Sequence, residues 1–313
     1  MGIGISLQAP AGTTNYVDAV VDRARTAAAA GVRSAWFGQR FDYDSTTLAA
    51  IVGREVPELQ VGTAAIPIFG RHPLLVGAQA QTAQAATSGR FHLGLGLGAG
   101  PFVETTFGIR HDRPIALLRE FLTALRPLLA TGTTDHHGEL ITAVTPMPSA
   151  LPGATPPAPI LVAAMAPQAL RATGELADGT LPLLASPKVI AEHIVPPLTK
   201  AAASAGRPSP RVVAFVHAVV TADIDATRER AAAQTGFLDQ FPSYQRVLNL
   251  GGFTRGVELA AIGDEKLVST AIRDHFDAGA TEVVVSGAFG TPEDQERTWQ
   301  LLGQLNRDRA ETA

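Results

Sequence analysis

The sequence has no cysteine among its 313 residues, which excludes disulfides, thiol nucleophiles, thiolate metal sites and iron–sulfur clusters. Only 17% of the residues are charged and the formal net charge is −4, so the basic surplus needed to bind nucleic acid or an anionic membrane is missing. No apolar run is long enough to predict a membrane-spanning helix, and the first residues lack the basic segment of a signal peptide. We therefore expect a cytoplasmic protein with no nucleic-acid partner and no membrane partner.

Motifs of hydrolytic catalysis are also missing. The sequence contains no HExxH, no GxSxG elbow and, at the predicted strand ends, no close pair of carboxylates. His136 and His137 are adjacent but have no third ligand nearby, so we predict no metal site. His217 lies in an apolar strand and is interpreted as a core histidine. A site this poor in charge suits a large planar cofactor that supplies its own reactivity.

Apolar strand-like segments alternate with helical periodicity along the chain. Eight strands are predicted, at Gly2–Leu7, Ser34–Gly38, Val61–Ile66, Phe91–Leu95, Ile160–Ala164, Gly179–Leu184, Val212–Val220 and Glu282–Ser286. A helical pattern follows each of them, such as the amphipathic segment Ile115–Ala130. The alternation predicts an α/β fold, a (β/α)8 TIM barrel, with a doubly wound parallel sheet and a small second domain as the alternative.

Two stretches interrupt the alternation. Residues 131–159 are rich in Thr, Gly and Pro, with GELITAV as a short extra strand, and residues 239–263 are irregular with helical patches. Hydrophobic residues make up 46% of the chain, enough for a substantial core. We predict a single barrel domain over residues 1–313 with insertions near 131–159 and 239–263.

The candidate site lies where predicted strands end. In a barrel the carboxyl ends of the strands carry the chemistry. Gly94-x-Gly96-x-x-Ala99 formally fits a loose dinucleotide fingerprint, but it follows a fourth strand rather than an opening one. We interpret Gly96 and Gly98 as bare backbone against which a cofactor lies, with a ligand-free strand exit as the alternative. At Ala163–Pro167 a strand end leads into a helix whose first N–H groups suit a phosphate, although an ordinary βα turn explains the pattern as well.

Four motifs in this order, RHP, SGRF, LGLG and ADG, resemble the luciferase-like monooxygenase superfamily. The likeness is greatest to its actinobacterial branch that uses the deazaflavin coenzyme F420, and it covers nearly the whole chain. The resemblance implies a barrel with insertions, a homodimer, and a cofactor bound at the carboxyl ends of the strands.

The resemblance also assigns roles to residues. It implies a non-prolyl cis peptide at Ala64-Ala65 beside the cofactor ring. The implied cofactor-binding residues are Gln39, Thr63, Ala64, Ala65, Gly96, Leu97, Gly98, Ala163, Ala164, Met165 and Ala166. Family members often have Gly-Gly where this chain has Met165-Ala166.

Acid–base groups depart further from the family pattern. Gln39 stands where the family often has His or Asp, and Ala99 where sugar-phosphate dehydrogenase members have a carboxylate. Because an amide does not usefully exchange a proton near neutral pH, oxidation of an alcohol is disfavoured. We predict catalytic roles for Gln39, Tyr43 and His72, the last two as neighbours that could supply a proton.

The predicted function is an F420-dependent reductase that transfers hydride from the reduced deazaflavin to an activated C=C or C=N bond. The substrate would be a small molecule or a peptide, such as a secondary metabolite or a peptide with a dehydroamino acid. The alternatives are a monooxygenase that uses FMN and a non-catalytic barrel that binds a flavin or deazaflavin.

Overall fold

A closed parallel sheet forms the framework of the protein, whose computed structural model describes residues 2–312. Its strands are β1 (Ile3–Ser6), β2 (Ser34–Phe37), β3 (Gln60–Thr63), β4 (Ile66–Pro67), β5 (Phe91–Gly96), β8 (Ile160–Ala163), β9 (Gly179–Thr180), β10 (Arg211–Val220), β11 (Ala261–Gly263) and β12 (Glu282–Ser286). The order is β11-β10-β12-β1-β2-β3-β5-β8-β9, and β9 also pairs with β10. The predicted (β/α)8 barrel is confirmed, and each of the eight predicted strands is present. The segment predicted as one strand at Val61–Ile66 forms two short strands, β3 and β4, and strand β11 was not predicted.

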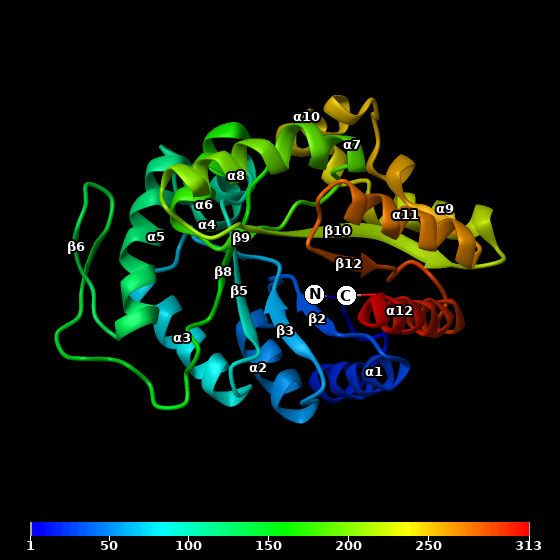
Figure 1. Ribbon diagram of the computed structural model, residues 1–313, viewed down its shortest axis with the longest axis horizontal. Coiled ribbons are helices and arrows are strands. Elements are labelled where there is room, and N and C mark those ends of the chain that lie inside the picture. Colours follow the sequence, from blue (N-terminus) through cyan, green and yellow to red (C-terminus); the bar gives the residue numbers. More distant parts are fainter. Residues whose placement is uncertain (1, 313) are drawn as a thin grey trace. The chain divides into compact units, whose positions relative to one another are not determined.

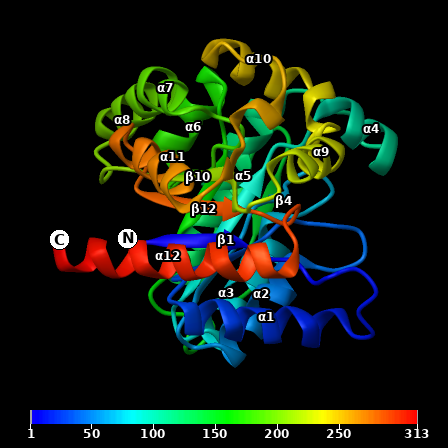
Figure 2. The same ribbon diagram turned by 90° about the vertical axis from the view of Figure 1, so that its right-hand side faces the viewer.

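One compact part of the chain runs to Trp36 and includes Leu181–Pro196 and the residues from Arg211 onward. Its helical segments are α1 (Tyr16–Ala30), α7 (Pro187–Val189), the π-helix η1 (Ile190–Ile194), α9 (Ile224–Thr235), the 3₁₀ helix η2 (Leu238–Gln240), α10 (Pro242–Gly251), the 3₁₀ helix η3 (Gly256–Leu259), α11 (Glu265–Asp277) and α12 (Pro292–Thr312). The segment 239–263, predicted to be irregular, therefore consists of short helical pieces and β11. The long helix α12 lies along β1 and α1 (Figure 2).

Close backbone packing joins α12 to α1 and β1. A Cβ atom on Gly303 would lie 1.6 Å from the Ala30 carbonyl oxygen, so only glycine fits there. The Asn306 side chain accepts from the Ile3 N–H at 2.7 Å and donates to the carbonyls of Ile3 and Gly31, both at 3.0 Å. One amide thus fastens the last helix to the first strand.

The other compact part comprises Phe37–Thr180 and Pro197–Pro210. Its helices are α2 (Ser45–Glu55), α3 (Pro73–Ala86), α4 (Gly100–Phe107), α5 (Pro114–Thr131) and α6 (Pro167–Leu176); α8 (Val195–Ser204) begins just before the second of these segments. Helix α4 was not predicted. Helices α3 and α5 lie side by side (Figure 1), where a Cβ atom on Gly77 would meet Leu128 Cδ2 at 2.3 Å.

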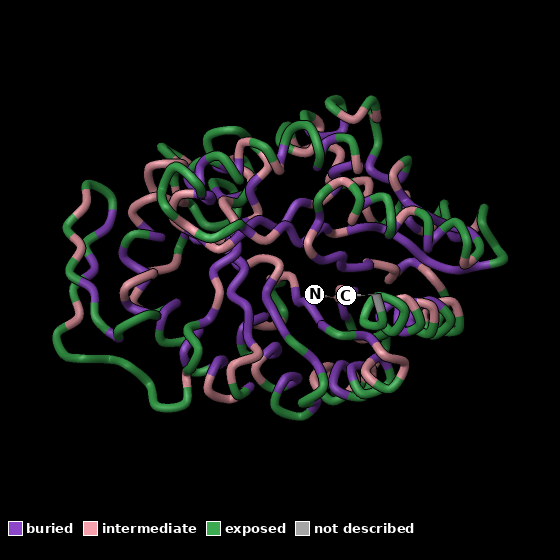
Figure 3. Tube along the Cα trace, in the orientation of Figure 1, coloured by how far each residue is buried: buried purple, intermediate pink, exposed green. Residues whose placement is uncertain are grey.

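The insertion predicted at 131–159 contains an antiparallel hairpin of β6 (Asp135–His137) and β7 (Thr142–Val144). Most residues of this insertion are exposed (Figure 3). The Glu120 carboxylate of α5 accepts from the backbone N–H groups of Glu139, Leu140 and Ile141. Desolvation opposes ionisation of Glu120, but these donors outweigh it and hold its pKa below the ordinary value. The turn of the hairpin is therefore anchored to α5 by one charged group.

Within residues 2–312 there is no helix with the length and apolarity that crossing a bilayer requires.

Candidate functional site

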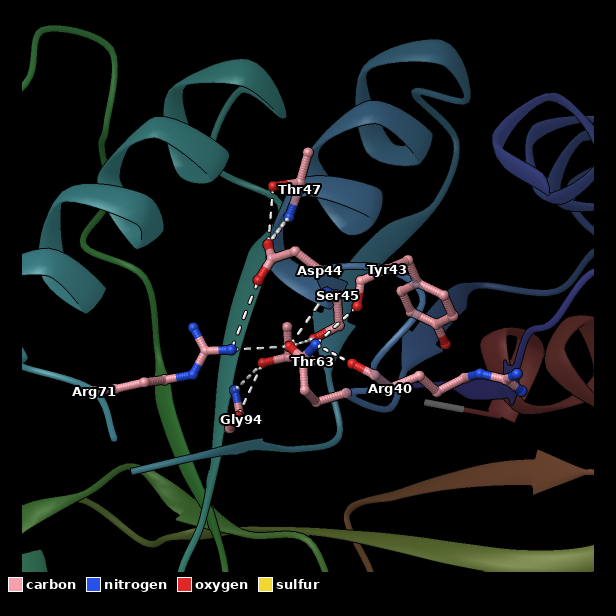
Figure 4. A network of polar contacts seen from close by, with 9 residues as sticks. Arg40, Tyr43, Asp44, Ser45, Thr47, Thr63, Arg71 and Gly94 are labelled. Carbon is pink, nitrogen blue, oxygen red and sulfur yellow. Dashed lines mark hydrogen bonds and ion pairs between the residues drawn. The ribbon is translucent and has the colours of Figure 1, made fainter. Parts of the chain in front are cut away.

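The carboxyl ends of β2, β3, β5 and β8 carry every predicted site residue, together with the loops and helix starts that follow them. All of these residues belong to the compact part that begins at Phe37. Parallel strands end at the same edge of a sheet, so the fold gathers segments that are far apart in the sequence. Polar side chains at this edge bond mainly to one another and to nearby backbone (Figure 4).

Gln39, which follows β2, fastens its own loop. Its Nε2 donates to the carbonyl oxygens of Arg40 at 2.6 Å and Tyr43 at 2.8 Å. Its Oε1 accepts from the Ser45 hydroxyl and from an Arg71 guanidinium nitrogen, each at 3.1 Å (Figure 4). A side-chain amide has two N–H donors and two acceptor lone pairs. The hydrogen-bonding capacity of Gln39 is therefore committed to shaping this loop.

Asp44 and Arg71 extend the same network. The Asp44 carboxylate caps α2 by accepting from the N–H and the hydroxyl of Thr47, both at 2.8 Å. A guanidinium nitrogen of Arg71 lies 3.7 Å from its other oxygen (Figure 4). Asp44 is thus engaged as a helix cap and an ion-pair partner.

Thr63, at the end of β3, connects that strand to β5. Its buried hydroxyl donates to the Gly94 carbonyl at 2.9 Å and accepts from the Gly94 N–H at 2.8 Å (Figure 4). Side chain and strand backbone therefore satisfy each other. Any role of Thr63 toward a ligand would be through the position of the strands.

Bare backbone forms the surface between β3 and β5. The Ala64-Ala65 peptide bond is cis, at the position where the family resemblance implied one. A Cβ atom placed on Gly96 would meet nothing nearer than the Ala65 Cβ at 3.5 Å. Gly98 has a φ of 68° and leads into α4. At Ala64, Ala65, Gly96 and Gly98 no side chain is larger than a methyl group, so a planar molecule could approach the main chain itself.

Two helices begin at this edge without a side-chain cap. Ala166 precedes α6 and Ala99 precedes α4, and neither forms a side-chain hydrogen bond to the helix start. Ahead of α6, the Thr180 hydroxyl donates to the Ala164 carbonyl at 2.7 Å and holds the strand end in place. Backbone N–H groups at such a helix start attract anions. The arrangement suits a phosphate on the tail of a planar ligand.

His72 and Tyr43, the predicted proton-supplying neighbours, occupy different surroundings. His72 Nδ1 accepts from the Leu74 N–H at 3.3 Å and caps α3, and His72 Nε2 donates to the Thr142 carbonyl at 3.0 Å. Both ring nitrogens are thus used in a helix cap and in a bond to the hairpin. The ring of Tyr43 lies 5.9 Å from the guanidinium carbon of Arg40. Tyr43 therefore packs against Arg40 within the loop whose backbone Gln39 holds.

His111 is a site residue that the sequence did not reveal. Its ring stacks on Phe69, with centroids 4.5 Å apart and an interplanar angle of 26°. Its Nε2 donates to the Leu97 carbonyl at 3.2 Å, next to the glycines at the end of β5. His111 lies fourteen positions after Leu97, beyond α4, so no local spacing could indicate the contact.

His217 lies in the other compact part and matches the interpretation as a core residue. Desolvation lowers its pKa to about 4, so the ring is neutral at pH 7. Its ring meets the edge of Phe289 at a centroid distance of 6.1 Å. Among residues 2–312 no group of three or more His, Asp or Glu side chains is placed to hold a metal ion.

Comparison with known proteins identifies the family to which the chain belongs and several relatives of similar sequence. A family model described as luciferase-like monooxygenase matches residues 1–295. An uncharacterized protein from Mycobacterium tuberculosis is 29% identical over 216 residues, which are 65% of this chain and 63% of the relative. A putative coenzyme F420-dependent oxidoreductase of that organism is 28% identical over 171 residues, 51% of this chain and 49% of the relative. The chain thus matches less than two thirds of the length of these relatives.

Solved structures share the fold. The coenzyme F420-dependent tetrahydromethanopterin reductase from Methanopyrus kandleri aligns with a TM-score of 0.81 and 21% identity, covering 97% of both chains. The oxygenating constituent of 3,6-diketocamphane monooxygenase from Pseudomonas putida, in complex with FMN, aligns with a TM-score of 0.76 and 15% identity, covering 98% of both chains. Because these sequence identities are low, the two structures support the fold alone.

Proposed function

Because this chain belongs to the luciferase-like monooxygenase family, we propose that it is an oxidoreductase that uses the reduced deazaflavin coenzyme F420 to reduce an activated C=C or C=N bond. A mycobacterial relative described as F420-dependent supports this choice of cofactor. The substrate would be a small molecule or a peptide, for example one with a dehydroamino acid. A homodimer and a cytoplasmic location are part of the same proposal.

The bare edge beside the uncapped start of α6 is the observation that carries the proposal. A planar ring system would lie on Ala64, Ala65 and Gly96, where no side chain extends beyond a methyl group. A phosphate on its tail would accept hydrogen bonds at the start of α6, beside Ala163–Ala166. The residues present therefore fit F420, which when bound in its reduced form supplies the hydride.

The scarcity of free acid–base groups supports the proposed direction, which is reduction rather than oxidation. Gln39 is engaged in its loop, Asp44 caps α2, and Ala99 offers no carboxylate. Oxidation of an alcohol would require a base at this position, whereas reduction of an activated double bond requires only that a proton arrive. That proton would come from water, from Tyr43, or from His72 once its Nε2–H leaves the Thr142 carbonyl. The role of the chain would be to bind, orient and exclude water.

A second candidate is a monooxygenase that uses reduced FMN and oxygen. The structural similarity to a monooxygenase in complex with FMN favours it. The same bare edge would accept an isoalloxazine ring, and the same helix start its single phosphate. A non-catalytic barrel that binds either cofactor is the third alternative, because acid–base groups are few.

Cofactor titration followed by anaerobic turnover separates these functions. We expect the purified protein to quench or shift the fluorescence of F420 and to bind FMN more weakly. We then expect reduced F420 to be reoxidised in the presence of an enone, an imine or a dehydroamino-acid compound. Tight binding of FMN with none of F420 would refute the proposal. Binding of reduced F420 without reoxidation by any of the three compounds would favour the non-catalytic barrel.

A further inference from the structure

Three phenylalanine side chains form an exposed cluster near the candidate site. Phe41, Phe102 and Phe107 have 74%, 41% and 40% of their surface exposed. The centroid of the Phe41 ring lies 6.0 Å from that of Phe102 and 6.1 Å from that of Phe107, and the last two are 6.4 Å apart. We refer to these three residues as the phenylalanine triad. Each ring contacts the other two, yet much of each remains accessible.

The triad residues lie on two segments that follow the strand ends of the candidate site. Phe41 lies two positions after Gln39, in the loop between Arg40 and Tyr43. Phe102 and Phe107 belong to α4, which begins two positions after Gly98. The carboxyl ends of β2 and β5 therefore each contribute to one aromatic surface.

Packing of the fold does not explain the triad. Helix α4 has one buried residue, Val103, which is the contact that seats it. A Cβ atom on Gly98 would lie 2.8 Å from Val103 Cγ2, so the helix is already held closely against the strand exit. Burial of a large apolar side chain stabilises a fold only when the side chain leaves water. Contiguous exposed apolar patches of a few hundred Å² are often functional.

Charged residues close to the triad in the sequence are paired within the chain. Arg40 donates to both carboxylate oxygens of Asp42, each at 2.9 Å, and Arg110 lies 2.8 Å from Asp112. Glu104 of α4 accepts from the His111 N–H at 3.2 Å. The surface thus offers aromatic faces and edges to a ligand rather than an unsatisfied cation. An uncharged aromatic group is the chemistry that fits it.

The size of the cluster favours a small molecule over a second protein. Three phenyl side chains exposed to this extent present on the order of 300 Å². A stable protein interface buries roughly 800 Å² on each partner. The triad alone is too small for such an interface, but it matches one or two aromatic rings.

We propose that the phenylalanine triad binds a planar, uncharged aromatic group of the substrate and so selects aryl-conjugated enones or imines. This inference rests on the proposed reductase function. Ring planes within the triad differ by 39°, 49° and 86°, so a bound ring would meet both faces and edges. The double bond conjugated to that ring would extend from the triad toward the strand ends.

A matched pair of compounds tests the proposal. Benzylideneacetone and its cyclohexyl counterpart carry the same enone and differ in having a flat or a puckered ring. We expect the wild-type protein with F420 to bind benzylideneacetone about tenfold more tightly, measured as Kd by calorimetry without turnover. A triple variant F41A/F102A/F107A should lose most of this preference, and F41L should lose part of it. Equal affinity of the wild type for both compounds, or an unchanged preference in the triple variant, would refute the proposal.

Control measurements separate this inference from the proposed function. Phe237 is 56% exposed in the other compact part, and F237A should retain the full preference. F420 affinity and the thermal unfolding midpoint should be the same in the triad variants and the wild type; a loss of F420 affinity would assign the triad to the cofactor instead. Sedimentation should give one oligomeric state for all variants, and a shift in the triple variant would assign the triad to a contact between copies. Failure of the proposed function looks different, because reduced F420 would then not be reoxidised while the aryl preference in Kd persisted.

Discussion

Two regions of the molecule lack side chains for opposite reasons. Where α12 meets α1, Gly303 allows one backbone to contact another, and a Cβ atom there would lie 1.6 Å from the Ala30 carbonyl oxygen. At the strand ends, a Cβ atom on Gly96 would meet its nearest neighbour, the Ala65 Cβ, at an ordinary 3.5 Å. Glycine at the first position is required by packing, whereas glycine at the second leaves space. Space that the fold does not require is available to a ligand.

The first way to break this comparison is to add a methyl group at the packed position. Gly303→Ala would push the new Cβ into main-chain atoms that cannot rotate away. We expect a loss of about 3 kcal/mol in the free energy of unfolding, at the upper end of overpacking effects. Urea unfolding measures it, with the exposed neighbour change Gln304→Ala as the control. A loss below about 0.5 kcal/mol would show that α12 moves aside easily.

The second test uses pH and concerns the same compact part as α12. Burial lowers the pKa of His217 to about 4 in the folded protein, against an ordinary value of 6.5 in the unfolded chain. Between these values the unfolded state binds more protons than the folded state, so stability is greatest above pH 6.5 and falls as the pH drops toward 4. A difference this large corresponds to about 3 kcal/mol. His275 is also buried with a lowered pKa and adds to the same trend.

Comparison with a His217→Gln variant isolates this contribution, because groups other than His217 titrate in both proteins. We subtract the unfolding free energy of the variant from that of the wild type. This difference should decrease from pH 7 to pH 4.5, because only the wild type loses the contribution of a neutral, buried His217. Unfolding in urea at a series of pH values measures it. Parallel stability curves for the two proteins would show that His217 is solvated in the folded state.

Sequence patterns predicted the framework well because strand burial leaves a local signal. Segments such as Phe91–Gly96 and Arg211–Val220 are apolar nearly throughout, as expected for strands covered on both faces. Helix α4 was missed because it spans eight residues with one buried side chain, which is too little for helical periodicity. Strand β11 has three residues in a stretch that otherwise has no regular pattern.

Individual site residues were harder to predict because their partners are distant or are backbone atoms. The sequence identifies Gln39 as an amide at a strand end, but not that its amide bonds to two carbonyls of its own loop. The His111 contact to Leu97 and its stacking on Phe69 depend on the path of α4. Likewise, the sequence does not distinguish Gly96 from Gly303. Only the surrounding atoms show that Gly96 has open space beside it and that Gly303 is closely packed.

The smallest expected effect on stability comes from adding a methyl group at the open position. Gly96→Ala places its Cβ in ordinary contact distance of Ala65, so the free energy of unfolding should change by less than about 0.5 kcal/mol. The same methyl group would occupy the surface proposed for the planar cofactor, and we expect the Kd for F420 to rise roughly tenfold, equal to about 1.4 kcal/mol. Fluorescence titration measures the affinity and urea unfolding the stability. Gly108→Ala is not a suitable control because Gly108 has a φ of 64°. Gln304→Ala is used instead, because Gln304 is an exposed residue of the other compact part. If Gly96→Ala binds F420 as the wild type does, the open space at β5 is not where the ring lies, and the site must be sought along the other strand ends of this compact part.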